Sequence, residues 1–134
     1  MWMVSGEFEV KMSPQKADNP EAESAGLGRM SLDKQYRGEL EATGKGEMMS
    51  VMTEVKGSGV YVAIERVNGT LSGRSGSFLL YHRGVMSRGV PELSIKVVPD
   101  SGTGDLSGLT GDMQIRMPDG KHFYDFNYNL SANQ

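Results

Sequence analysis

The chain has 134 residues and a net charge of −3, with 18 glycines and no cysteine. The length predicts one domain, residues 1–134. The acidic balance argues against a nucleic-acid partner, and the lack of cysteine excludes disulfides, thiolate zinc sites and a cysteine nucleophile.

No apolar run approaches the ~20 residues of a membrane-spanning helix, and no export signal is recognisable at the N-terminus. We therefore expect a cytoplasmic protein without membrane association. The glycines are spread along the chain, which disfavours helices, because an interior glycine costs a helix about 1 kcal/mol relative to alanine.

The first third of the chain predicts strands separated by one loop. Residues 2–12 alternate between apolar and polar side chains, as a half-buried strand does. Residues 13–27 contain two prolines and many small residues, and they predict a polar loop or flap. Residues 29–43 alternate most regularly and predict one long strand that bends at Gly38, or two strands joined there.

The rest of the chain continues this pattern. Further strands are expected over residues 47–55, 60–67, 77–83, 92–98, 112–117 and 122–130. The pair Asn68-Gly69 indicates a tight hairpin turn, and Asp119-Gly120 indicates another. The total of about eight antiparallel strands predicts an all-β fold, a single eight-stranded antiparallel barrel.

Several glycine-rich runs resemble known families. Residues 101–115, SGTGDLSGLTGDMQI, are similar to a glycine-patterned hairpin of the allene oxide cyclases and dirigent proteins. The runs KGSGVYVAIERVNGTLSGRSGSFLLYHRG, VVPDSGTGDLSGLTG and GKHFYDFNYNL resemble a family of small bacterial proteins, the domain of unknown function 3224. The resemblance implies a barrel like that of allene oxide cyclase. It implies no catalytic residue, because a glycine-patterned corner reports geometry and not chemistry.

Charged side chains on the predicted inward faces are the candidates for chemistry. Glu65, His82 and His122 each share a face with apolar residues. A carboxyl group in such a place must be paired or protonated, and a protonated one is suited to general acid or base catalysis. We therefore predict Glu65, His82 and His122 as candidate catalytic residues. The structural alternative is that Glu65 pairs with Arg66 or Lys34 and that the histidines are core or rim residues.

The candidate ligand contacts are aromatic side chains and Lys34 on the predicted inward faces, and Arg66, whose guanidinium group is suited to an anionic group of a ligand. They are Lys34, Tyr36, Tyr61, Arg66, Phe78, Tyr124 and Tyr128. Met30, Met49, Met113 and Met117 also fall on predicted inward faces, where thioethers fill a core or line an adaptable pocket. Two histidines and a carboxylate can hold iron(II), but no ligand spacing supports this here, so we expect no metal and no cofactor.

Three functions fit these observations. The first is a barrel that binds a small apolar or aromatic molecule. The second is an isomerase or lyase that uses interior Glu/His acid–base chemistry. The third is a filled barrel with a structural role, in which the apolar outer face of residues 60–67 is covered by a neighbouring subunit of a homo-oligomer or by the 13–27 flap.

Overall fold

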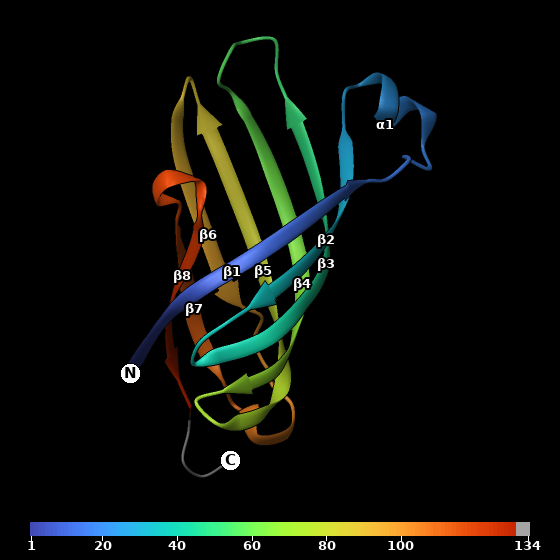
Figure 1. The fold of residues 1–134 in the computed structure, drawn as a ribbon. Coiled ribbons are helices and arrows are strands. Elements are labelled where there is room, and N and C mark those ends of the chain that lie inside the picture. Colours follow the sequence, from blue (N-terminus) through green and yellow to red (C-terminus); the bar gives the residue numbers. More distant parts are fainter. Residues whose placement is uncertain (131–134) are drawn as a thin grey trace.

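The computed structural model describes residues 1–130, which form a closed barrel of eight antiparallel strands (Figure 1). The strands are β1 (Trp2–Pro14), β2 (Gly28–Tyr36), β3 (Leu40–Met52), β4 (Gly59–Leu71), β5 (Arg74–Ser87), β6 (Val90–Val97), β7 (Thr110–Arg116) and β8 (His122–Asn129). Each strand pairs with its neighbour in sequence, and β1 closes the barrel by pairing with both β2 and β8. The predicted fold is confirmed. Residues 131–134 of the predicted domain lie outside the described part.

The predicted flap contains the one α-helix among residues 1–130, the short α1 (Pro20–Ser24). Asn19 caps this helix through its side-chain oxygen, which accepts a hydrogen bond from the amide of Glu21. No helix within the described residues is long and apolar enough to cross a membrane.

The regular run 29–43 forms two strands, the second of the two predicted alternatives. β2 and β3 pair along their length, from Gly28 opposite Ser50 to Tyr36 opposite Ala42. Gly38 lies in the turn between them with a φ of 108°, a conformation that other residues adopt only with strain.

The hairpin turn predicted at Asn68-Gly69 is wrong. Both residues lie inside β4, where they pair with Thr43 and Ala42 on one side and with Ser77 and Gly76 on the other. A Cβ at Gly69 would overlap the backbone of Glu41, so this glycine permits close packing of strands. The actual turn is Ser72-Gly73, at φ of 49° and 83°. The turn predicted at Asp119-Gly120 is confirmed.

One end of the barrel is filled with side chains. Here the segment between β6 and β7 folds across the end of the barrel and buries Leu106 and Leu109. Aromatic rings stack above them: Phe78 lies 5.6 Å from Phe126, and Phe126 lies 5.5 Å from Tyr128. We call this part of the barrel, with the turns 37–39 and 72–73, the closed half.

The opposite end carries the connections 53–58, 88–89 and 117–121 and the α1 segment (Figure 1). We call it the open half. Most inward side chains around its mouth are thioethers and small residues, to which Tyr61 adds one aromatic ring. β6 pairs with β7 only at Ile95 and Lys96, so the beginning of β6 is bonded on one side alone.

Candidate functional site

A buried carboxylate lies inside the barrel where the two halves meet. Glu65 is on β4 between the inward residues Ala63 and Val67, and it is 1 % exposed. The cross-strand register places its side chain beside β3 on one side and β5 on the other. This burial confirms the predicted inward orientation of Glu65 on an otherwise apolar face.

Three side chains from β2 and β5 bind this carboxylate. Nζ of Lys34 on β2 donates a hydrogen bond to Oε1 at 2.8 Å, and Nε2 of His82 on β5 lies 2.7 Å from the same oxygen. The hydroxyl of Tyr36 donates to Oε2 at 2.8 Å. Glu65, Lys34, Tyr36 and His82 are all buried and form what we call the Glu65 cluster.

Two features of the neighbouring strands make this cluster possible. A Cβ at Gly44, on the inward face of β3, would overlap Oε2 of Glu65, so glycine there provides the space for the carboxylate. The ammonium group of Lys34 also lies 5.4 Å from the ring centre of Phe8 and 5.8 Å from that of Tyr36, at cation–π distance. Gly44 was not among the predicted site residues, although a glycine within a strand indicates such close approach.

The electrostatics of the cluster keep Glu65 ionised. Burial by itself would raise the pKa of Glu65, but the hydrogen bond from His82 and the positive charge of Lys34 outweigh it and lower the pKa to about 2. Since the carboxylate then carries no proton, Nε2 of His82 is the donor in their hydrogen bond. Burial and the adjacent Glu65 carboxylate together raise the pKa of Tyr36.

The other predicted catalytic residue, His122, is separate from this cluster. It lies at the start of β8 in the open half, where its ring centre is 5.1 Å from that of Phe8. Within residues 1–130 it makes no side-chain hydrogen bond or ion pair. The structure thus brings together Glu65, His82, Lys34 and Tyr36 but not His122.

The remaining predicted ligand contacts occupy three different places. Phe78, Tyr124 and Tyr128 are buried in the closed half. Arg66 lies on the outer face of β4, where its guanidinium group is 3.4 Å from the hydroxyl of Ser77. Only Tyr61 faces the open half. Burial and the negative charge of Glu65 raise the pKa of Tyr61, so the Glu65 cluster acts electrostatically on this side chain.

A hollow of about 390 Å³, which we call the mouth pocket, opens at this end of the barrel. Its lining is mostly apolar and consists of Met48, Ser50, Met52, Gly59, Val60, Tyr61, Gly84, Val85, Met86, Pro91, Glu92, Leu93 and Met117. Tyr61 lies against Gly84, where a Cβ would overlap its ring. The next inward residues below Tyr61 and Gly84 are Ala63 and His82, so the Glu65 cluster lies directly beneath the mouth pocket.

The methionine prediction is only partly right. Met117 lines the mouth pocket, whereas Met49 points out of the barrel and is 48 % exposed. Its neighbour Met48 takes the inward place on β3. Because Met48 and Met49 are adjacent, one of them lies on each face of β3. Both are apolar, so the sequence pattern does not show which of the two points inward.

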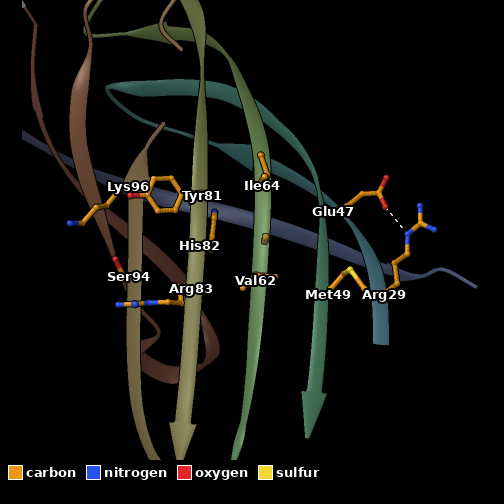
Figure 2. A pocket seen from close by; sticks show the side chains of 11 residues that line it. Arg29, Glu47, Met49, Val62, Ile64, Tyr81, His82, Arg83, Ser94 and Lys96 are labelled. Atoms are coloured by element: carbon orange, nitrogen blue, oxygen red, sulfur yellow. Dashed lines mark hydrogen bonds and ion pairs between the residues drawn. The ribbon is translucent and has the colours of Figure 1, made fainter. Parts of the chain in front are cut away.

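A larger hollow, of about 740 Å³, lies outside the barrel wall (Figure 2). Its lining side chains come from the outward positions of β2 to β6, and Ala63 and His82 lie on the strands beneath it. It is therefore separate from the mouth pocket. Among residues 1–130, no group of three or more His, Asp or Glu side chains is arranged to hold a metal ion.

Comparisons with known proteins agree with the fold. A family model described as "Protein of unknown function (DUF3224)" matches residues 4–128. A crystal structure of a DUF3224 protein of unknown function from Shewanella oneidensis MR-1 is 50 % identical, covers 98 % of each chain and superimposes with a TM-score of 0.91. No curated protein matches the chain.

Proposed function

This chain belongs to the DUF3224 family, and we propose that it binds a small apolar or aromatic molecule in the mouth pocket of its barrel. The observation that carries the proposal is the apolar hollow of about 390 Å³ at the open end. Pockets for small ligands typically enclose about 300–1,000 Å³ and have mainly apolar walls with few polar groups.

The lining indicates the chemical class of the ligand. Its flexible side chains are the thioethers of Met48, Met52, Met86 and Met117, which adapt to irregular apolar shapes. Tyr61 adds an aromatic ring that can stack on a flat ligand. The polar side chains around the pocket are the hydroxyls of Ser50 and Tyr61 and the carboxylate of Glu92. Such a surface favours an uncharged, largely apolar ligand with one polar group at most.

The backbone supports a pocket in this place. Gly59 and Gly84 present no side chain to the lumen, and the beginning of β6 is not bonded to β7. The closed half has large aromatic side chains at its inward positions. The difference leaves space at the open end, as in other barrels that hold one small ligand.

The acid–base alternative receives less support from the geometry. A general base must accept a proton near neutral pH, whereas the pKa of Glu65 is lowered to about 2 and both its oxygens accept hydrogen bonds. The observed contacts match the structural alternative, in which Glu65 pairs with Lys34. We therefore assign the cluster to the support of the pocket floor.

Titration with a neutral fluorescent naphthylamine tests the binding proposal. We expect saturable binding to the wild-type protein, and an affinity at least 10-fold weaker for Ser50→Trp, because the indole fills the pocket. Thr43→Trp is the control, since Thr43 is exposed on the outer face of the same strand. Ser50→Trp and Thr43→Trp variants with equal affinity would place the probe elsewhere.

Native mass spectrometry of freshly purified protein provides an independent measurement. We expect a bound apolar molecule in the wild-type protein and its loss in Ser50→Trp. If neither the probe nor a panel of apolar and aromatic molecules binds to the wild-type protein, and if nothing copurifies with it, the proposal is wrong.

A further inference from the structure

The outward side chains of β3 to β6 form an apolar strip on the barrel wall, which we call the outer groove (Figure 2). Its centre consists of Met49, Val62, Ile64 and Tyr81. Val62 is 51 % exposed and Ile64 is 60 % exposed, so nothing within residues 1–130 covers them. Exposed apolar strips of this kind typically mark interaction surfaces.

The 13–27 flap, one of the predicted covers, lies away from this strip. Its helix α1 is beside the beginning of β2 (Figure 1), and Asp18 in the flap forms a 3.6 Å ion pair with Arg29 at the edge of the groove. The central residues of the strip remain exposed with the flap in this position. A cover for these residues must therefore come from outside residues 1–130.

The register arranges the outer groove in rows that cross the strands. One row runs from Glu47 on β3 through Ile64 and Tyr81 to Lys96 on β6. The row nearer the open end runs from Met49 through Val62 and Arg83 to Ser94, and the next consists of Val51, Val60, Val85 and Glu92. Opposite charges thus lie at the two ends of the row that contains Ile64 and Tyr81.

This arrangement is complementary to itself. Consider two copies whose outer grooves face each other and are related by a two-fold axis. The axis lies between the two sheets, parallel to the strands and midway between β4 and β5. Each row of one copy then faces the same row of the other copy in reverse order. Ile64 then faces Tyr81 of the second copy, and Val60 faces its Val85. Glu47 faces Lys96 of the second copy, and no row places two like charges opposite each other.

We propose that the outer groove is a homodimer interface, with the outward faces of β4 and β5 packed against those of a second copy. Glu47 and Lys96 can both form the required ion pairs. Oε1 of Glu47 accepts a hydrogen bond from Arg29 at 2.8 Å, whereas Oε2 of Glu47 and Nζ of Lys96 have no ion-pair partner among residues 1–130. Val60, Val85 and Glu92 also line the edge of the mouth pocket, whereas its other lining residues, such as Met48 and Tyr61, lie outside these rows.

Sedimentation velocity over a concentration series tests this interface. We expect a species of twice the chain mass for the wild-type protein. Ile64→Glu should weaken the dimer by about 30-fold or more, because it places a carboxylate against an apolar contact. Met3→Glu is the matched control: Met3 is 62 % exposed, on the outward face of β1, so its substitution should leave the dimer intact.

Charge reversal tests the pairing itself. Glu47→Lys and Lys96→Glu should each weaken self-association, since like charges then face each other. A mixture of the two single variants should form heterodimers, because lysines at 47 and 96 in one copy face glutamates at 96 and 47 in the other. Circular dichroism of each variant verifies that the barrel remains folded.

Three results would overturn the proposal. They are a monomeric wild-type protein at all concentrations, equal self-association of Ile64→Glu and Met3→Glu, and a mixture of the charge variants that remains monomeric. A monomer that cosediments with lipid vesicles would assign the outer groove to a membrane surface instead. Binding of the naphthylamine probe to Ile64→Glu measures the mouth pocket separately, so the two proposals can fail independently.

Discussion

The two halves of the barrel have the same strands but different interiors. The closed half has aromatic rings and leucines at its inward positions, with Leu106 folded across its end. The open half has methionines, glycines and the ring of Tyr61 around a hollow of about 390 Å³. The comparison teaches that one sheet can enclose a packed core at one end and a hollow at the other, provided that bulky side chains are concentrated at one end.

The Glu65 cluster lies where these halves meet. Lys34 supplies the opposite charge, Tyr36 and His82 add hydrogen bonds to the carboxylate, and no side-chain polar atom of the described residues is buried without a hydrogen bond. A buried ion pair of this kind contributes little net stability relative to apolar residues, but the loss of one partner is costly. Substitutions in the cluster should therefore destabilise the barrel where its two halves meet.

The largest expected effect is that of Lys34→Met. This variant keeps most of the volume of the side chain but leaves Glu65 without its cationic partner, and it should lower the free energy of unfolding by about 3–5 kcal/mol. Lys45→Met is the control, because Lys45 forms an exposed ion pair with Asp33 and should change stability by less than about 1 kcal/mol. Urea denaturation measures both, and equal losses would contradict the assignment of the cluster.

Truncation of one residue in each half compares the halves directly. Leu106→Ala should destabilise the protein by about 2–5 kcal/mol, because Leu106 is 1 % exposed and its removal leaves a cavity. Met86→Ala at the mouth should cost about 1 kcal/mol or less, since Met86 is 38 % exposed. The same unfolding measurements apply, and a larger loss for Met86→Ala would show that the open half is packed as a core.

Acidic pH should lower the free energy of unfolding by up to roughly 3 kcal/mol, because Glu65 becomes protonated. The pKa of Glu65 is lowered from its ordinary value of 4.5 to about 2, and each pH unit corresponds to about 1.36 kcal/mol. The stabilisation is complete above pH 4.5, the value for the unfolded chain, and is lost as the pH falls towards 2. The stability difference between wild type and Glu65→Gln should narrow over this range, and a constant difference would contradict the lowered pKa.

The sequence pattern predicted much of the barrel because each strand turns one face to the core and the other to solvent. Alternation located the strands, and it also identified Glu65 as a carboxyl group on an apolar face. The Asn68-Gly69 prediction failed because a local turn preference competed with long-range strand pairing. Gly69 is required by the close approach of Glu41 on β3, a residue 28 positions earlier in the chain.

The candidate site could be predicted only in part. Lys34 and His82 were recognised as inward polar residues, but their common attachment to one oxygen of Glu65 depends on the register of β2 to β5. The orientation of Met48 and Met49 was equally undetermined by local pattern. The mouth pocket is lined by the beginning of β6, which is not paired with β7, and no property of either strand alone indicates this short pairing.

The sequence by itself determined the all-β character of the chain, the antiparallel barrel and the inward carboxylate, because alternation and glycine placement are local properties of strands. Only the tertiary structure decided which cations bind Glu65, which end of the barrel stays open and which outward residues share a row. These depend on register and closure, which place residues that are distant in sequence within reach of one another.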